Sequence, residues 1–570
     1  MSHSHLPRSL FATLALAAAA SPLAAQSLSG RIVDPQSVPI AGITVDPGHG
    51  AATAVSDSAG LFTITGLQVR TYDVEYRPSQ GAPWCGSLVA TPVSGATNVG
   101  DVVLLPGFTV AGTAVNAANA PIPGGNVNVY DQAGTKLFTP HDGTVATGAF
   151  MVTVPAGTWD VHIVPPTASL LVTRVYNDLV AAAPVNLGNV TLATGYPVSG
   201  TVVDSVSSVP VGSTKIVARN ALTGEAIPLT NNTANSFGAF SLILPYGIVD
   251  LDFEPPLGNS HVARRVFGAF VLGTTALGQV RLQNGVFVSG SVGSAGGPVD
   301  NADIDVFAAD GHKLFLAHDK TLANGAFSVA VPAGGTYTVR VEPPVAAGLA
   351  GHLSAPTPVN AATSLPAIVL PTGVAVSGTI SGPQGPEAGA NLNFFDQNGV
   401  ELVTVGDHTD ANGHYATFVP AGTWRIDVQG RQGNRGRPVT TTGIAIAGAT
   451  TWNLTLPQKQ LVADVTGFGT PTLLQGGLLP LNPSLEGLVA PSVSAVLDVV
   501  VALPGGTEIP VMPSIPLGVI PFPLHLVGVW VPIPVVPTTA LGKPLDFVMR
   551  YRDPVTNAVL DAAHTSFVVQ

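Results

Sequence analysis

Hydrophobic and polar positions alternate with a period of two in one short segment of the chain. In "GTWDVHIV", Trp159, Val161 and Ile163 alternate with Asp160 and His162. Successive side chains of a β-strand point to opposite faces, so the pattern predicts a strand whose aromatic and branched residues enter a core. His162 is then expected to face solvent. The same inward set recurs four more times, as Tyr72, Val74 and Tyr76; Val249, Leu251 and Phe253; Tyr337, Val339 and Val341; and Trp424, Ile426 and Val428.

Other sequence marks recur together with this strand. A Gly-x-aromatic turn precedes every copy, and each repeat opens with a segment such as "VSGTV" and closes with one such as "NVTL". The marks advance together by roughly 82–90 residues, far beyond the ~20–50 residues of solenoid repeats, so each repeat is expected to be a whole domain. The turn glycines are Gly60, Gly148, Gly238, Gly325 and Gly413.

Turn chemistry and the lack of a helical period set the expected fold class. Gly-containing corners such as "YDQAGTKL" and "FDQNGVEL" separate apolar runs, as short hairpins require. We predict an all-β protein, a tandem array of antiparallel Greek-key β-sandwiches. The last part of the chain leaves the repeat pattern, and its strands around "DPVTNAVLD" predict an immunoglobulin-like sandwich.

The marks also give domain boundaries. After a signal peptide at 1–26, we expect five sandwiches and a sixth, immunoglobulin-like one, at 27–107, 108–195, 196–285, 286–373, 374–457 and 458–570. Each of the first four sandwiches ends on a glycine that the opening glycine of the next follows within a few residues, so almost no free linker is expected. Strands of about seven residues at ~3.3 Å each make a module roughly 25 Å tall, so six in line would extend on the order of 150 Å.

The segment "SDSAGLFTITGLQVRTYDVEY", residues 56–76, resembles the carboxypeptidase regulatory-like domain, and "TDANGHY", residues 409–415, is similar to it. The usual signature of that family is Thr/Ser-Asp-x-x-Gly-x-aromatic, an alternating strand and Gly-x-Tyr. The second and fourth repeats depart from it, with Val145 and Leu322 at the Asp position, and the third carries one extra residue. The resemblance spans residues 27–457 and implies prealbumin-like (transthyretin-like) sandwiches of the kind found in secreted bacterial proteins. It reaches only the accessory module of carboxypeptidases and implies no peptidase activity.

Composition narrows the class of protein. Hydrophobic residues make up 46% of the chain and charged residues 10%, which is enough apolar material to fold and argues against extended disorder. The formal net charge is −12 and no basic run is present, so nucleic-acid binding is not expected. The one basic loop, with Arg431, Arg435 and Arg437, is interpreted as a solvated loop and not as an anion site.

The N-terminus predicts export. His3, His5 and Arg8 precede the apolar run "SLFATLALAAAA", with small residues up to Gln26 that suit cleavage, so we expect a secreted, extracellular or cell-surface protein, with the periplasm as another possibility. No integral membrane span is expected after cleavage, because prolines break the other long apolar segment. Cys85 is the only cysteine, so no internal disulfide forms, and we interpret it as a buried small hydrophobe.

Histidine and aspartate pairs are the candidate chemistry. His141-Asp142 reappears as His318-Asp319 and, reversed, as Asp407-His408, each before the Gly turn. We interpret these residues as hydrogen-bonding loop ends and expect no catalytic, cofactor-binding or metal site. Candidates for a weak calcium or zinc site form one cluster: Asp407, His408, Asp410, Asn412 and His414.

No known catalytic signature is present, neither His-Glu-x-x-His nor Gly-x-Ser-x-Gly. We therefore expect a secreted non-enzyme that serves as an extracellular spacer, surface or matrix component, with an extracellular protein or polysaccharide of unknown identity as partner. An array of carbohydrate- or polymer-binding modules is the alternative, which exposed loop aromatics such as Trp84 and Trp452 would support. The third possibility is the accessory region of an extracellular hydrolase, since a glycosidase carboxylate pair remains open.

Overall fold

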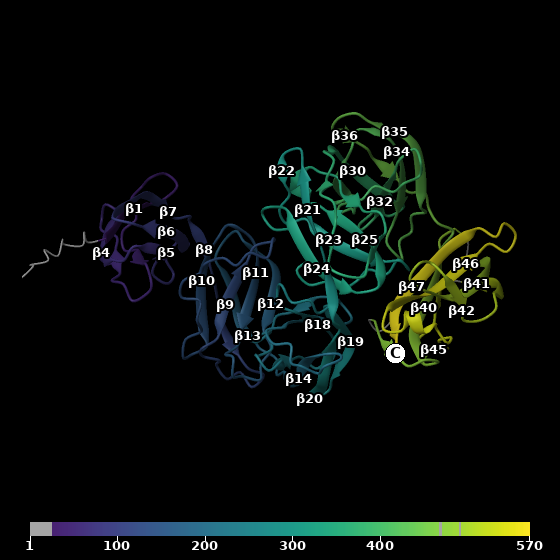
Figure 1. The fold of residues 1–570 in the computed structure, drawn as a ribbon, viewed down its shortest axis with the longest axis horizontal. Helices are drawn as coiled ribbons and strands as arrows, with labels where there is room; N and C mark the ends of the chain where they lie inside the picture. Colours follow the sequence, from purple (N-terminus) through teal and green to yellow (C-terminus); the bar gives the residue numbers. More distant parts are fainter. Residues whose placement is uncertain (1–25, 467–469, 490–491, 522) are drawn as a thin grey trace, which may run out of the picture. The chain divides into compact units, whose positions relative to one another are not determined.

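The computed structural model describes residues 26–466, 470–489, 492–521 and 523–570 (Figure 1). The predicted signal peptide at 1–26 lies outside this part of the chain, apart from Gln26. Strands dominate the described residues, and the helices among them are two 3-10 turns, η1 (Val345–Ala347) and η2 (Thr538–Ala540). No helix in this part is long and apolar enough to cross a membrane. The strands form paired sheets around six hydrophobic cores, which confirms the predicted class of tandem β-sandwiches.

The first two sandwiches are each built from two sheets. The strands of the first are β1 (Gln26–Val33), β2 (Thr44–Asp46), β3 (Ala54–Val55), β4 (Leu61–Leu67), β5 (Arg70–Arg77), β6 (Ser87–Val93) and β7 (Ala96–Val103), in the orders β4-β1-β7 and β3-β2-β5-β6. Those of the second are β8 (Gly107–Val115), β9 (Asn126–Tyr130), β10 (Ala149–Pro155), β11 (Gly157–Val164), β12 (Arg174–Ala181) and β13 (Val185–Thr191), in the orders β10-β8-β13 and β12-β11-β9.

The third and fourth sandwiches keep the same plan with additional short strands. The third has β14 (Tyr196–Asp204), β15 (Lys215–Asn220), β16 (Ala226–Ile227), β17 (Ala239–Leu244), β18 (Gly247–Glu254), β19 (Arg264–Val271) and β20 (Thr275–Leu282). The fourth has β21 (Gly285–Ser294), β22 (Gly297–Pro298), β23 (Asp303–Ala308), β24 (Ala326–Pro332), β25 (Gly335–Glu342), β26 (His352–Leu353), β27 (Thr357–Val359), β28 (Thr363–Ser364) and β29 (Ile368–Val369).

The fifth sandwich repeats the plan, and the sixth departs from it. The fifth has β30 (Val374–Gly382), β31 (Gly385–Pro386), β32 (Asn391–Phe395), β33 (His414–Val419), β34 (Gly422–Gln429), β35 (Val439–Ile446), β36 (Thr450–Thr451) and β37 (Leu454–Thr455). The sixth has β38 (Leu461–Thr466), β39 (Thr472–Leu473), β40 (Leu478–Gly487), β41 (Ser492–Ala502), β42 (Glu508–Pro510), β43 (Ile515–Pro521), β44 (Leu524–His525), β45 (Val529–Pro532), β46 (Pro544–Arg552) and β47 (Val559–Val569).

One parallel pairing recurs inside the otherwise antiparallel repeats. The first strand of each repeat pairs antiparallel with the strand after the Gly turn and parallel with the last strand, as β1 does with β4 and β7. The same parallel pairing joins β8 to β13, β14 to β20, β21 to β28 and β29, and β30 to β36 and β37. A parallel pair needs a crossover, and here the crossover passes through the second sheet of the sandwich, which produces the Greek-key connection.

The turn glycine recurs for two physical reasons, which Gly148 illustrates. Its φ is 76°, a left-handed conformation that other L-residues adopt only at a cost. A Cβ atom at Gly148 would also lie 2.4 Å from Ala114 O in the facing first strand. The corresponding glycines have φ between 70° and 75° and meet the same obstacle at 2.2–2.4 Å: Gly60, Gly238, Gly325 and Gly413.

The alternating strands β5, β11, β18, β25 and β34 place their inward sets in the five repeat cores, as predicted. Fourteen of the fifteen residues are buried, at 0–9% exposure, and Trp159 is half-buried. The first aromatic of the set keeps its polar tip bonded to nearby backbone. Trp159 Nε1 donates to Pro155 O at 2.9 Å, Trp424 Nε1 to Pro420 O at 3.0 Å, and Tyr337 Oη to Pro332 O at 2.8 Å.

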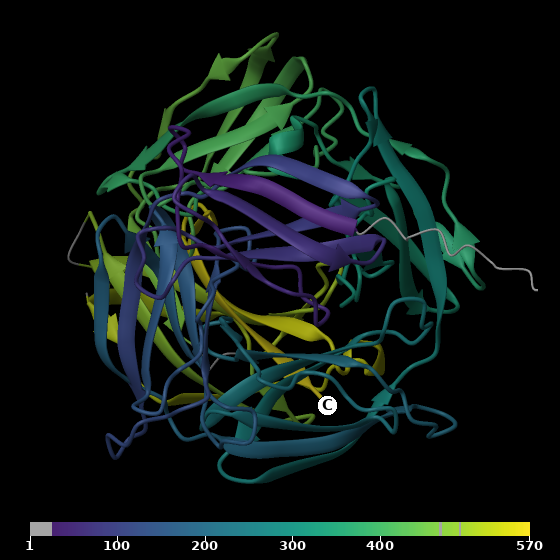
Figure 2. The ribbon, with the colours of Figure 1, turned by 90° about the vertical axis from the view of Figure 1, so that its left-hand side faces the viewer.

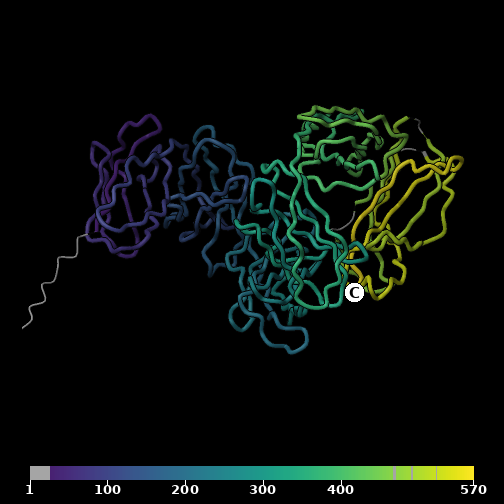
Figure 3. Tube along the Cα trace, turned by 45° about the horizontal axis from the view of Figure 1, so that its top comes forward, coloured from purple at the N-terminus to yellow at the C-terminus, as the bar shows by residue number. Residues whose placement is uncertain are grey.

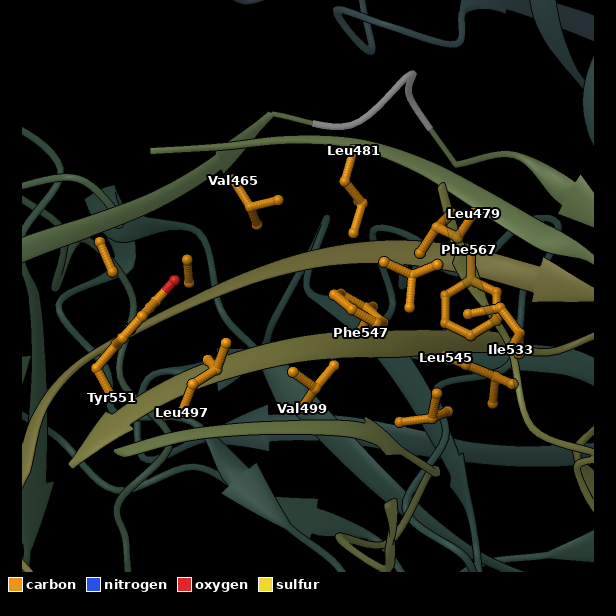
Figure 4. Close-up of a cluster of buried hydrophobic side chains, with 14 of the residues drawn as sticks. Val465, Leu479, Leu481, Leu497, Val499, Ile533, Leu545, Phe547, Tyr551 and Phe567 are labelled. Atoms are coloured by element: carbon orange, nitrogen blue, oxygen red, sulfur yellow. The ribbon is translucent and has the colours of Figure 1, made fainter. Parts of the chain in front are cut away.

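The sixth sandwich has the immunoglobulin-like character that the sequence predicts. Its larger sheet runs β39-β47-β46-β41-β42, with β43 also on β41, and faces a sheet of β38, β40, β44 and β45. Figure 4 shows Phe547 and Phe567 from the larger sheet pointing toward Leu479 and Leu481 from the other. The short β39 pairs parallel with the terminal strand β47, whereas the other pairings within these two sheets are antiparallel. Strand β47 therefore lies between β39 and β46 in the larger sheet and contributes buried residues to the core of the sixth sandwich.

The described residues divide into two compact units, one that ends at Thr194 and one that begins at Gly195. Within the second unit the sixth sandwich contacts the third and the fourth. Thr472 Oγ1 donates to Phe267 O at 3.2 Å, and Lys543 Nζ lies 2.6 Å from Asp310 Oδ2. Figures 2 and 3 show the strands of these sandwiches from two other directions, in the colours of Figure 1. The expectation of six sandwiches in line is therefore wrong for this unit, because the last sandwich doubles back onto earlier ones.

Candidate functional site

Backbone hydrogen bonds attach the connector after each of the first five sandwiches to a loop of the sandwich that precedes it. In each case an amide in the loop that follows the alternating strand donates to a connector carbonyl. The five bonds run from Cys85 to Leu105, Val172 to Ala193, Val262 to Gln283, Ala350 to Pro371 and Arg437 to Pro457, at 2.6–3.0 Å. At four of the five junctions a second bond returns from the connector to the loop, from the amides of Gly107, Gly285, Gly373 and Lys459. Each connector is thus held on the sandwich that precedes it.

His141 and His318 lie at two of these junctions and reach across them. His141 Nε2 donates to Pro78 O in the first sandwich at 3.1 Å, and His318 Nε2 donates to Pro255 O in the third at 2.9 Å. Both residues have positive φ, 62° and 56°. The predicted hydrogen-bonding role therefore has definite partners, which are carbonyls of the preceding sandwich, and sequence reasoning had not identified them.

Backbone hydrogen bonds show which residue of the fifth sandwich corresponds to His141 and His318. Asp142, Asp319 and Asp407 each use their carbonyl oxygen to accept from the strand opposite, from Val127, Ile304 and Leu392. Gly406, with a φ of 71°, accordingly occupies the position of His141 and His318. Asp407-His408 is therefore not a reversed copy of the pair, since the histidine follows an aspartate that keeps its place in the repeat.

The five candidate metal ligands separate into two groups. Asp407 Oδ1 bonds His408 Nδ1 at 2.9 Å, and its other oxygen accepts from Thr404 Oγ1. Asp410 instead closes the Gly turn, accepting from the amides of Asn412 and His414 at 2.8 and 2.9 Å. Those bonds lower the pKa of Asp410, the amide of His414 contributing most.

No three His, Cys, Asp or Glu side chains in the described ranges stand close enough together to hold a metal ion. The Asp410 carboxylate already serves the turn, which leaves Asp407 and His408 as an isolated pair. The view that these loops are scaffolding and not metal or acid–base sites remains a prediction.

His162 differs in part from its predicted environment. It lies on the outer face of β11, away from the core, but it is only partly exposed. Its ring packs against Tyr130 with 4.7 Å between ring centroids. Burial lowers the pKa of His162, and the charge of Asp160 opposes that shift. The expected solvent-facing histidine is therefore a partly shielded one, because the neighbouring strand β9 supplies a ring to cover it.

Cys85 is buried at the first junction, 4% exposed, which confirms its interpretation as a small core residue. Burial raises the pKa of its thiol to about 12, so little reactive thiolate is present at neutral pH. Its Sγ lies 2.4 Å from where a Cβ of Gly107 would be, so the connector glycine makes room for it. The thiol therefore fills space and is unsuited to nucleophilic chemistry.

A cleft of about 940 Å³, lined by both polar and apolar side chains, lies between the fourth and fifth sandwiches. One wall is the outer face of β25, with Thr336, Thr338, Arg340 and Glu342, and Phe307 beside it; the opposite wall is Asn391 and Asn393 of β32 with the 401–408 loop. Arg340 Nε pairs with Glu342 Oε1 at 2.7 Å. Burial raises the pKa of Glu342, and Arg340 opposes that shift.

Two of the five predicted candidates, Asp407 and His408, line this cleft, and the other three do not. The other cleft residues were missed because the outward positions of a strand look like ordinary solvent-facing residues in a sequence. The cleft offers hydroxyl, amide and carboxylate groups that can bind a polar ligand, but no paired base and nucleophile.

A second polar cluster missed by the sequence analysis holds the junction after the third sandwich. His261 Nε2 bonds the buried Asp204 carboxylate at 3.0 Å and Asn284 Nδ2 donates to the same oxygen. Hydrogen bonds, first of all from the amide and hydroxyl of Ser207, hold the pKa of Asp204 well below its usual range. An ionised aspartate at the end of β14 thus links the connector to the loop after β18.

Comparisons with known proteins identify no family. No family model and no curated protein match the chain. Among solved structures, the Bacillus anthracis TIE protein aligns at 11% identity over 73% of this chain and 75% of its own, with a TM-score of 0.14. A streptococcal ancillary pilin aligns at 13% identity over 46% and 99%, TM-score 0.15, and a DUF3823 family protein from Bacteroides ovatus at 10% over 35% and 100%, TM-score 0.20. TM-scores this low carry no argument about function, and the fold class rests on the sheets themselves.

Proposed function

We propose that the protein is a non-enzymatic, extracellular structural array of β-sandwiches, a component of a surface or matrix. The observation that carries the proposal is the hydrogen bonding of all five connectors to the preceding sandwich. A chain with no free linker resists bending and cleavage between its domains, which suits a structural role outside a cell. Because the sixth sandwich contacts the third and fourth, the proposal is a rigid assembly and not a fully extended spacer.

Hydrogen exchange of the full chain tests this role at single amides. The amides of Cys85, Val172, Val262, Ala350 and Arg437 donate to the connectors and should exchange as slowly as amides in the edge strands beside them. Exchange of these amides at the rate of an unstructured peptide would mean flexible linkers and would remove the basis for a rigid array. The amide of Gln132, exposed in the turn after β9 and without a hydrogen bond of its own in this part of the chain, supplies the fast-exchanging reference within the same molecule.

A polysaccharide- or polymer-binding role is the second candidate, which the cleft between the fourth and fifth sandwiches favours. Its amide, hydroxyl and carboxylate groups approach from two walls, as in sites that take polyhydroxylated ligands. Trp84 and Trp452 do not contribute, because both pack against their own cores. Titration with neutral and acidic oligosaccharides, with Asn393→Ala and Thr338→Ala as variants, tests it. Binding that both variants leave unchanged would exclude this cleft.

The proposal extends to the type of domain, the domain boundaries and the export of the protein. We take the five repeats to be carboxypeptidase regulatory-like domains with the boundaries expected from the sequence, secreted after cleavage within residues 1–26. The third possibility, an accessory region of an extracellular hydrolase, has no further support from the described side chains. N-terminal sequencing of the exported protein tests the cleavage site.

A further inference from the structure

A lysine, an asparagine and an aspartate meet where the fifth sandwich, the last connector and the sixth sandwich join. We call them the junction triad: Asn434 in the loop after β34, Lys459 in the connector and Asp561 in β47. Lys459 Nζ donates to Asn434 Oδ1 at 2.8 Å and lies 3.0 Å from Asp561 Oδ1. Lys459 and Asn434 are 7% and 8% exposed, and the Asp561 side chain is 10% exposed. A lysine this deeply buried is rare unless it is paired.

The space around the Asn434 carboxamide is provided by two glycines. A Cβ on Gly430 would lie 1.9 Å from Asn434 Nδ2, and one on Gly436 would lie 3.2 Å from it. Asn434 Nδ2 donates to Gly436 O at 3.0 Å, which leaves Oδ1 turned toward the ammonium group. Since Lys459 can only donate, this orientation of the carboxamide is fixed by its partners.

The lysine is also a departure from the repeat. The corresponding position of the other four connectors is a glycine, Gly107, Gly195, Gly285 or Gly373. At Gly107 and Gly285 a side chain would collide with the loop of the sandwich before the connector and with a strand of the sandwich after it, whereas Lys459 is accommodated and directed at the carboxamide. The last junction thus places a primary amine, a carboxamide and a carboxylate in one dry site.

We propose that Lys459 and Asn434 join covalently, forming an amide bond between Nζ and Cγ with release of ammonia. Cγ is bonded to Oδ1 at about 1.23 Å, so it lies within ~4 Å of Nζ, close to the ~3–3.5 Å at which reacting atoms are aligned. Asp561 is the proton acceptor. In a site shielded from water, transfer of a proton from the ammonium group to the carboxylate yields the neutral amine that can attack.

The step balances without an added reactant. The Nζ lone pair forms a bond to Cγ while the carbonyl π pair moves to Oδ1, giving a tetrahedral intermediate. Asp561 returns its proton to Nδ2. The electron pair on Oδ1 then re-forms the carbonyl as the Cγ–Nδ2 bond breaks with its electron pair on nitrogen, and ammonia leaves. Nζ then loses its surplus proton to Asp561, which passes it to the departing ammonia. One ammonium and one carboxamide become one amide and one ammonium ion, with no change of oxidation state.

The bond would change what holds the last junction. The other four connectors are held by hydrogen bonds, whereas this connector would be covalently attached to the loop of the sandwich before it. The inference goes beyond the proposed structural role and does not depend on it, because it concerns a bond that forms or does not form in the isolated chain.

Intact mass spectrometry of the purified full chain is the test. The mass should be lower than that of the sequence, counted from the N-terminus found experimentally, by one ammonia molecule. Digestion with trypsin and a second protease should give one peptide in which Asn434 and Lys459 are linked. Lys459→Arg and Asp561→Asn should each restore the full mass, corrected for the substitution, while Lys543→Arg, which alters a different ion pair, should keep the loss.

A wild-type chain with full mass and with cleavage after Lys459 would overturn the proposal. Loss of ammonia that persists in Lys459→Arg would do so too, since it would come from another group such as a succinimide. If a variant fails to fold, the peptide map of the wild-type chain decides by itself. The outcome is also separate from the exchange rates that test the structural role.

Discussion

Replacing Trp424 with alanine tests how far one inward aromatic supports its sandwich. The side chain is 9% exposed in the core of the fifth sandwich, and its Nε1 donates to Pro420 O at 3.0 Å. Trp424→Ala should destabilise the fifth sandwich by about 3–5 kcal/mol, because it leaves a cavity and an unpaired carbonyl. Trp424→Phe, which keeps most of the volume and loses the hydrogen bond, should cost only about 1–2 kcal/mol.

Hydrogen exchange of the full chain measures this loss locally, with the other sandwiches as internal references. At roughly 1.4 kcal/mol per tenfold, amides of β33 and β34 should exchange about 140- to 3,700-fold faster in Trp424→Ala. Amides of β10 and β11 in the second sandwich should not change. Trp530→Ala is the matched control, because that indole is 62% exposed and should cost little. Unchanged protection of β34 in Trp424→Ala, or an equal effect of Trp530→Ala, would refute the reasoning.

The remaining predictions concern the turn, the junction histidines and one carboxylate. Gly148→Ala should destabilise the second sandwich by more than the ~1–2 kcal/mol that an alanine in the left-handed conformation costs, because its Cβ would also collide with Ala114 O. Gly188 has a φ of 63° and open space around it, so Gly188→Ala should cost only that ~1–2 kcal/mol. Equal losses of stability in the two variants, measured by hydrogen exchange, would disprove the collision. His141→Asn and His318→Asn should each change stability by no more than about 1 kcal/mol in a denaturant titration, because asparagine tolerates the positive φ; loss of stoichiometric zinc binding in calorimetry would instead make these residues ligands. Burial alone would raise the pKa of Asp310, but hydrogen bonds from Lys543 and His312 outweigh it and lower the pKa to about 2. Because the folded pKa is the lower one, the Asp310–Lys543 contact should stabilise the molecule above about pH 4 and be lost as the pH falls toward 2; an NMR titration of Asp310 with a midpoint near its ordinary value of 3.8 would contradict this.

The repeat could be predicted from sequence because its causes are local. Alternation in β11 follows from strand geometry, and the Gly-x-aromatic turn requires a residue that accepts positive φ at Gly148. These rules act on neighbours within one turn or strand, so the same letters recur wherever the same local structure does. The sheet class and the inward sets could therefore be predicted, and of the fifteen inward residues Trp159 alone is half-buried.

The candidate site could be predicted only in part. Asp407 and His408 could be named as candidates because aspartate and histidine commonly bind metals or ligands. Their neighbours in the cleft, however, come from β25 and β32 of two different sandwiches. Outward strand residues such as Arg340 and Asn393 have the pattern of any solvated face. What turns that face into a cleft wall is the placement of another sandwich opposite it, which no local pattern encodes.

The sequence by itself determined the strand periodicity, the turn chemistry and the number of repeats, since each depends on the preferences of a few adjacent residues. Only the tertiary structure decided which residues meet across junctions: His141 with Pro78 O, Lys459 with Asn434 and Asp561, and Lys543 with Asp310. Partners separated by 25 to more than 230 residues are brought together by the packing of whole sandwiches. Such packing is a sum of many weak surface contacts, so the chemistry of a junction becomes visible only when the domains are in place.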